Sequence, residues 1–253
     1  MRNVIAIAQK ELRSYFASPI AYIIIGFFAL PFGVFFYLYL DVFVKQSLQM
    51  GQMGGSVNIN QQVIRYVLQN ASVIILFVMP MITMRTYSEE KRSGTIELLL
   101  TSPVTDAEII LGKFFGALGL YIAMLLVTLF YIGILFVYGN PEWRPLIAGY
   151  LGLLLMGGAF VAVGLLISST TNNQIVAGIV SFVVFLLLWI IGWFSESAGP
   201  TIGSICSYLS ITDHFDDFSK GIIDTKHVIY YLSLITFGLF LTAKSVDTER
   251  WRG

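Results

Sequence analysis

Long apolar runs separated by short polar stretches make up most of this chain. Six of the runs reach the roughly 20 residues that an α-helix needs to cross a bilayer, and they cover residues 20–44, 63–84, 109–138, 146–168, 174–194 and 228–244. Runs of this length without strand-like alternation favour helices over a barrel, because a helix satisfies its own backbone hydrogen bonds in lipid. The pattern predicts an all-α integral membrane protein with six transmembrane helices.

The polar stretches predict the remaining elements. Residues 1–19 repeat apolar positions at spacings of three and four, which predicts an amphipathic helix in the membrane interface. Residues 45–62 are rich in Gln and Gly and are expected to form an irregular external loop, either a connector or a contact for an external partner. Residues 195–227 keep enough apolar positions to lie against or dip into the outer leaflet. We therefore expect residues 1–253 to form a single transmembrane domain.

The boundaries expected within that domain follow the apolar pattern. Residues 1–19 are the interfacial helix, 20–194 the first five crossings, 195–227 the external segment, and 228–253 the sixth crossing with a tail.

Composition and charge agree with a membrane location. Hydrophobic residues make up 57% of the chain and charged residues 12%, about half the charged fraction of roughly 25% in a soluble domain. The 15 basic and 15 acidic side chains cancel, so the net charge gives no reason to expect a nucleic-acid partner. Most Lys and Arg residues, Lys113 among them, fall on the side of the two termini, which places both termini in the cytoplasm by the positive-inside rule.

The sequence EEKRSGTIELLLTSPVT, residues 89–105, interrupts the apolar pattern between the second and third crossings. Ser93 and Gly94 can start a short helix that Pro103 stops. The apolar side chains expected on one face of that helix are Ile96, Leu99 and Leu100. One interpretation is a charged anchor whose leucines rest on lipid, and the other is an amphipathic helix that fills a groove on a soluble partner.

A second local pattern follows directly. Residues 105–108, TDAE, predict a capping box in which Thr105 and Glu108 exchange hydrogen bonds at the start of the third crossing.

Three stretches taken together resemble the ABC-2 type permeases, the membrane subunits of one large class of ABC transporters. They are QKELRSYFASPIAYI near the N-terminus, RTYSEEKRSGTIELLLTSPVTDAEIILGK in the loop, and YLSITDHFDDFSKGIID before the last crossing. Within that family the chain is most similar to the permease subunit associated with bacterial gliding motility, with the copper-site maturation permease of nitrous-oxide reductase systems second.

The resemblance implies a permease subunit in the bacterial inner membrane. It would couple ATP hydrolysis by a separate ATPase subunit to export or conformational work, with gliding motility as one setting. The alternative is a membrane scaffold that transports nothing and transmits ATPase-driven motion to a cell-surface machine.

The resemblance also implies roles for individual residues. The coupling helix that docks on the ATPase maps to Gly94, Thr95, Ile96, Glu97, Leu98, Leu99, Leu100 and Thr101. The interfacial helix touches the ATPase in relatives, which adds Lys10, Glu11 and Arg13. Short re-entrant helices before the last crossing would close the pathway outside, with Tyr208, His214, Phe215 and Phe218 as gate residues.

We expect this chain to have no catalytic residues and to bind no cofactor itself. It lacks the phosphate-binding pattern G-x-x-x-x-G-K-[ST], so ATP and Mg would enter through the partner ATPase. The other expected partners are a second permease subunit, identical or related, membrane lipid, and an external or accessory membrane protein. An intramembrane enzyme is disfavoured, because no Ser/His/Asp or paired-Asp arrangement lies at membrane depth.

One polar cluster raises the question of a metal site. Asp213, His214, Asp216 and Asp217 offer suitable ligands, but carboxylates at these helical spacings do not all converge on one point. We interpret the cluster as a solvated polar face, expect no metal, and read His227 as a lone residue that marks the start of the last crossing.

Overall fold

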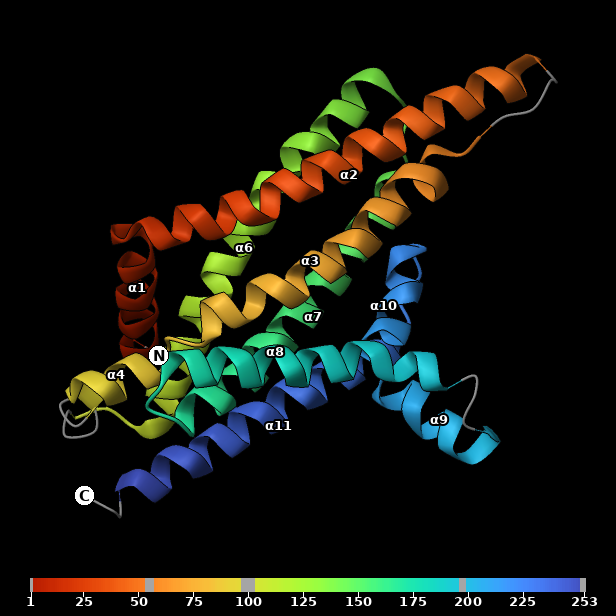
Figure 1. Ribbon diagram of the computed structural model, residues 1–253. Coiled ribbons are helices and arrows are strands. Elements are labelled where there is room, and N and C mark those ends of the chain that lie inside the picture. The colour runs from red at the N-terminus through yellow and green to blue at the C-terminus, as the bar shows by residue number, and fades with distance from the viewer. Residues whose placement is uncertain (1, 53–56, 97–102, 196–198, 251–253) are drawn as a thin grey trace.

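The computed structural model describes residues 2–52, 57–96, 103–195 and 199–250 (Figure 1). These parts contain helices and no strands. Six helical segments are long and apolar enough to cross a membrane, as predicted, and they are Pro19–Gln52, Asn60–Ser93, Asp106–Tyr138, Trp143–Ser169, Gln174–Phe194 and Thr225–Thr248. The predicted all-α fold with six candidate spans is therefore confirmed.

The six segments correspond to labelled elements. They are α2 (Pro19–Gln52), α3 (Arg65–Thr83) entered through a π-turn at Asn60–Ile64 and followed by α4 (Ser88–Ser93), α6 (Asp106–Tyr138), α7 (Trp143–Ser169), α8 (Gln174–Ile190) with a 3-10 turn at Ile191–Phe194, and α11 (Thr225–Arg250). Three further helices do not span: α1 (Arg2–Ala17), α9 (Gly199–Leu209) and α10 (Ile211–Ser219).

The elements divide between two ends of the molecule. Figure 1 places α1, α4 and the C-terminal end of α11 at one end, and α9 with the C-terminal end of α2 at the other. We refer to these as the α4 end and the α9 end.

Helix α7 is the centre of the core. It packs against α11, α3 and α10, and its small residues let neighbouring side chains approach closely. A Cβ on Gly157 would lie 2.2 Å from the Tyr121 ring, and one on Gly152 would lie 2.6 Å from Phe218 Cβ. The Tyr121 hydroxyl also donates to the Leu153 carbonyl at 2.7 Å, which ties α6 to α7.

Helix α1 runs alongside the first turns of α6 and meets α2 at a sharp corner (Figure 1). Two glycines of α6 allow the approach, since a Cβ on Gly112 would meet Ile7 at 2.6 Å and one on Gly116 would meet Glu11 Cβ at 2.6 Å. At the corner Ser18 Oγ accepts from the backbone N–H of Ile20 at 3.3 Å.

Two local predictions have different outcomes. The capping box is confirmed: Thr105 Oγ1 accepts from Glu108 N at 3.3 Å, and the Glu108 carboxylate accepts from Thr105 N at 3.2 Å. The irregular loop expected from residue 45 is wrong up to residue 52, because α2 continues to Gln52. The helix formers Gln, Leu and Met fill this stretch, and Lys45 pairs with Asp41 one turn earlier at 2.6 Å.

Candidate functional site

A buried lysine lies where α1, α4 and α6 meet. Lys113, two turns into α6, is 1% exposed. Its ammonium donates to the Thr86 carbonyl at 2.8 Å and forms ion pairs with Glu90 at 2.8 Å and Glu11 at 3.2 Å. The Tyr87 ring centroid lies 5.0 Å from the same nitrogen and adds a cation–π contact. A buried ammonium needs such partners, because an isolated one would be strongly destabilising.

The two carboxylates come from different helices. Glu11 belongs to α1 and Glu90 to α4, and the more exposed Lys10 reaches both, at 3.7 Å and 3.3 Å. Partial burial alone would lower the pKa of Lys10, but the carboxylates of Glu90 and Glu11 outweigh it and raise that pKa. Lys10, Glu11, Glu90 and Lys113, which we name the Lys113 cluster, thus form a charge-neutral junction of three helices.

Helix α4 is also fixed to the end of α7. Ser168 Oγ accepts from the backbone N–H groups of Tyr87 and Ser88, both at 3.1 Å, and donates to the Met84 carbonyl at 3.1 Å. The Lys91 ammonium donates to the Ser169 carbonyl. The short α4 therefore has polar links to α1, α6 and α7.

A small cavity of about 270 Å³ opens beside the Lys113 cluster, between α1 and α4. At its edge the Arg85 guanidinium pairs with Glu89 at 2.8 Å. The Tyr15 hydroxyl donates to the Ile82 carbonyl at 2.9 Å, and burial raises the pKa of Tyr15 to about 12. The phenol is therefore a fixed hydrogen-bond donor at neutral pH.

The predicted coupling segment is described only in part. Glu97, Leu98, Leu99, Leu100 and Thr101 lie outside the described residues. Gly94 is the left-handed C-cap of α4 with φ 71°, and Thr95 is exposed.

The structure describes only the start of the predicted helix. The charged residues 89–92 belong to α4, Gly94 ends that helix, and residues 95 and 96 are helical again where the described part stops. The expectation about Ile96 is wrong. Ile96 does not face outward, because it is 9% exposed and packs into the apolar core.

The three predicted contacts on α1 separate by exposure. Lys10 and Arg13 are exposed, whereas the Glu11 side chain is 12% exposed and paired with Lys113. Lys10 and Arg13 are therefore open to a partner, and Glu11 serves the internal junction.

The four predicted gate residues lie on α9 and α10, at the α9 end. Phe215 and Phe218 are buried against α7, and His214 is 7% exposed, whereas the Tyr208 side chain is 65% exposed. Three of the four predicted gate residues, those on α10, are therefore buried, whereas Tyr208 on α9 lies at the surface.

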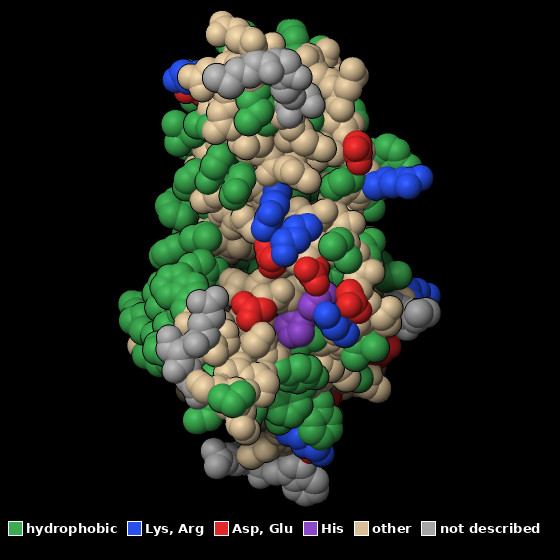
Figure 2. Space-filling model, turned by 90° about the vertical axis from the view of Figure 1, so that its right-hand side faces the viewer, with side chains coloured by type: hydrophobic (Ala, Val, Ile, Leu, Met, Phe, Trp, Pro, Cys, Tyr) green, Lys and Arg blue, Asp and Glu red, His purple; other side chains and the backbone are tan. Residues whose placement is uncertain are grey.

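The prediction of a solvated polar face on α10 is wrong for His214, whereas the Asp216 and Asp217 side chains remain 38% and 32% exposed. Figure 2 shows basic, acidic and histidine side chains gathered on the α9 end. His214 is buried, and His227 is not alone, because the two Nδ1 atoms are 2.6 Å apart. Sequence spacing could not indicate this contact, because it depends on how α10 folds back against α11. Over the described residues no three His, Cys, Asp or Glu side chains are grouped to hold a metal.

Asp216 ties α10 to α3. Its carboxylate accepts from Arg65 at 3.2 Å and from Gln69 at 2.9 Å, and it also pairs with Lys220. Burial alone would raise the pKa of Asp216, but the hydrogen bond and charge of Lys220, together with Arg65, lower it.

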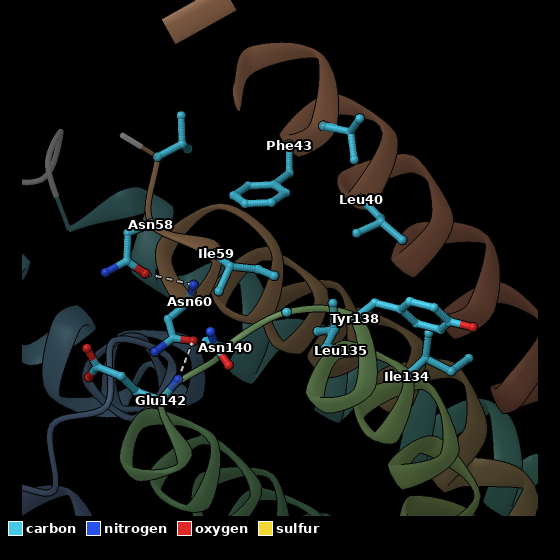
Figure 3. A pocket seen from close by; sticks show the side chains of 13 residues that line it. Leu40, Phe43, Asn58, Ile59, Asn60, Ile134, Leu135, Tyr138, Asn140 and Glu142 are labelled. Atoms are coloured by element: carbon cyan, nitrogen blue, oxygen red, sulfur yellow. Dashed lines mark hydrogen bonds between the residues drawn. The ribbon is translucent and has the colours of Figure 1, made fainter. Parts of the chain in front are cut away.

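A second cavity, of about 530 Å³, lies between the ends of α2 and α6 (Figure 3). Leu40 and Phe43 line one side. Its polar groups hold the neighbouring loops, since Asn58 Oδ1 accepts from Asn60 N at 2.8 Å and Asn60 Oδ1 accepts from Glu142 N at 3.1 Å. The side-chain oxygens of Asn58 and Asn60 are thus already engaged in structural bonds.

The junction residues Lys113, Glu90 and Ser168 were missed by sequence reasoning. A signal was present for Lys113, which is a lone cation inside a long apolar run, the kind of position that usually marks a functional or paired charge. No local signal identified Glu90 or Ser168, because their partners lie far away in the chain.

Comparison with known proteins found a matching family model. A family model described as ABC-2 family transporter protein matches residues 5–243, which include the Lys113 cluster and reach into all six candidate spans. No curated protein matches the chain.

Proposed function

The chain belongs to the ABC-2 family of transporter proteins, and from this we propose that it is the permease subunit of a bacterial inner-membrane ABC exporter. Members of this family are membrane components without catalytic activity of their own. ATP and Mg would bind to a separate ATPase subunit, and this chain would convert their turnover into helix movement. Both termini would lie in the cytoplasm, together with α1 and α4.

The Lys113 cluster is the observation that carries the proposal. Helix α4 leads directly into residues 94–101, which we propose as the coupling helix. Its Glu90 is paired with Lys113 of α6, which is paired in turn with Glu11 of α1. Because separating a buried ion pair leaves an uncompensated charge, these elements should move together. A push on the coupling helix would therefore reach the spanning helix α6 through α4.

We propose that the exposed Lys10 and Arg13 add a second contact with the ATPase. At the α9 end, α9 and α10 would form re-entrant helices whose residues Tyr208, His214, Phe215 and Phe218 close the pathway. A second permease subunit, identical or related, would complete the pathway, and an accessory membrane protein could join it outside.

Capture of the ATPase tests the proposal. The tagged chain is extracted in mild detergent, and its stoichiometric partners are identified by mass spectrometry. We expect a Walker-type ATPase with the wild type, and its loss with Leu99→Asp, because a charge would enter the apolar face that docks. The matched control is Leu48→Asp, which places the same charge on a 67% exposed leucine near the C-terminal end of α2.

The outcomes are distinct. An ATPase present with wild type and Leu48→Asp but absent with Leu99→Asp supports the coupling helix. Equal capture by all three chains contradicts the assigned docking site, and no ATPase in any sample contradicts the permease assignment.

Export and mechanical work at the cell surface would use the same ATPase and differ in whether a solute crosses. ATP-dependent accumulation of a labelled amphiphile in inverted vesicles would favour export, and gliding motility would then be one biological setting of it. ATP turnover without any flux would favour the scaffold.

A further inference from the structure

The chain has two histidines, His214 on α10 and His227 at the start of α11, and they contact each other. Both are nearly buried, at 7% and 5% exposure. Their Nδ1 atoms are 2.6 Å apart, and the Tyr230 ring stacks on His214 at 3.8 Å between centroids. The permease function proposed above uses His214 as one of four gate residues, but it assigns no role to the contact of His214 with His227.

The surrounding hydrogen bonds fix how many protons the pair holds. The Tyr208 carbonyl can only accept, so His214 Nε2, 3.0 Å away, must carry a proton. The Asp217 carboxylate also accepts, so a second proton lies between it and His227 Nε2, at 2.8 Å. A third lies between the two Nδ1 atoms, which can share one hydrogen and have no room for two. Two neutral imidazoles supply only two protons, so the arrangement contains one more.

The position of the extra charge follows from the environment. Burial lowers the pKa of His214, against the opposing effect of its bond to the Tyr208 carbonyl, so His214 is the neutral ring. The Asp217 carboxylate lies 2.8 Å from His227 Nε2 and 3.8 Å from the Lys220 ammonium. The extra positive charge is therefore best offset on His227, the ring that faces this carboxylate.

The other charged groups near the pair do not replace these partners. They are Asp213, Asp216 and Lys220 on or just after α10, Asp224 and Lys226 before His227, and Arg65 on α3. Asp216 is engaged by Arg65, and Asp224 by Lys226 at 3.2 Å. Helix α7, which also packs on α10, has Arg144 at its start as its one charged side chain.

We propose that Asp217, His227 and His214 form a binding site for a single proton that holds α10 against α11. Loss of this proton would set the lone pair of a ring nitrogen against another acceptor. Addition of a further proton would set two N–H groups against each other. The contact between α10 and α11 is therefore strongest when one proton is bound, and it weakens in both acid and alkali.

The pH dependence follows from the proton count. In the unfolded chain both histidines titrate near their ordinary pKa of about 6.5, so the pair holds two extra protons well below that pH and none well above it. The folded pair holds one. Folding therefore releases a proton in acid and takes one up in alkali, and the contribution of the pair to the unfolding equilibrium constant rises about tenfold per pH unit on either side of a minimum.

Nitrogen NMR of the full chain tests the proposal directly. The chain is labelled with 15N-histidine and purified through a streptavidin-binding tag, so the two histidines supply all ring signals. At pH 7 we expect three protonated ring nitrogens, one unprotonated nitrogen, and a coupling between the two Nδ1 atoms through their shared hydrogen. Two protonated and two unprotonated nitrogens, or four protonated ones, would overturn the proposal.

Two matched variants test the role of the carboxylate. Asp217→Asn removes the negative charge that faces His227, so the extra proton should leave at a pH at least one unit lower than in the wild type. Asp224→Asn removes a nearby charge that bonds to neither ring and should leave the titration within a few tenths of a unit. An equal shift in both variants would show that general local charge, and not this hydrogen-bonded chain, holds the proton. The readout needs no ATPase or substrate, so its failure would leave the permease proposal intact.

Discussion

Lys113 is the most buried residue of the Lys113 cluster, and we expect its loss to be the most destabilising. Its ammonium is 1% exposed and lies between two carboxylates from separate helices. Removing it would leave Glu11 and Glu90 facing each other with only the exposed Lys10 to offset them. Breaking a buried pair costs more than an exposed pair contributes, because the remaining charge stays desolvated.

We therefore expect Lys113→Met to lower the free energy of unfolding by about 3 kcal/mol or more. Lys10→Met is the matched control, because Lys10 joins the same carboxylates with a side chain that is 62% exposed, and its loss should amount to less than about 1 kcal/mol. Denaturant or thermal unfolding of the purified chain in detergent measures both. Equal effects would contradict the importance of burial at Lys113.

The packing of α1 on α6 depends on two glycines of α6 that face α1, Gly112 and Gly116. Gly116 leaves room for Glu11, whose Cβ would lie 2.6 Å from a Cβ at that position. Larger side chains would push α1 away and separate Glu11 from Lys113. The contact between α1 and α6 thus depends on the size of the side chains as well as on the pairing of their charges.

Gly116→Leu should destabilise the protein by roughly 1–3 kcal/mol through overpacking and should reduce ATP-dependent activity of the complex. Gly133→Leu is the matched control on the same helix, because a Cβ at Gly133 meets nothing within 4 Å. The thermal midpoint and the ATPase rate of the assembled complex report the two effects. A loss of similar size in both variants would indicate a general cost of leucine in α6.

The elements that could be predicted from sequence are those decided by neighbouring residues. The six spans follow from length and hydropathy, and the capping box at Thr105 follows from a four-residue pattern. The continuation of α2 beyond residue 45 was missed because glycine and glutamine content suggested a loop, whereas the helix formers and the Asp41–Lys45 pair decided the outcome.

The junctions could not be predicted in the same way. Lys113 and Glu11 are 102 positions apart, and His214 and His227 meet only because α10 folds back on α11. From the sequence, Lys113 was assigned to the cytoplasmic side of the membrane and His227 to the start of a helix. The apolar pattern indicates how deep in the membrane a side chain lies, but it does not identify the residues that the side chain contacts. Tertiary packing supplied those partners.

The arrangement of the whole molecule makes a prediction about the membrane. Helix α4 lies at one end, and the connection between α6 and α7, at residues 139–142, lies toward the other, since it contacts the loop before α3. If the α4 end faces the cytoplasm, as the distribution of Lys and Arg predicts, these two positions must differ in their access from outside the cell. The orientation of the chain in the membrane therefore determines the accessibility of both positions.

Single-cysteine labelling decides this orientation. In a Cys206→Ser background, which removes the chain's one cysteine, Asn140→Cys and Ser93→Cys each place a thiol at an exposed position. A membrane-impermeant maleimide added to intact spheroplasts should label Asn140→Cys, whereas Ser93→Cys should react only after lysis. The reverse pattern would put the proposed coupling helix outside, where no ATPase could reach it, so the same experiment that fixes the topology also tests whether the Lys113 cluster can receive force from ATP hydrolysis.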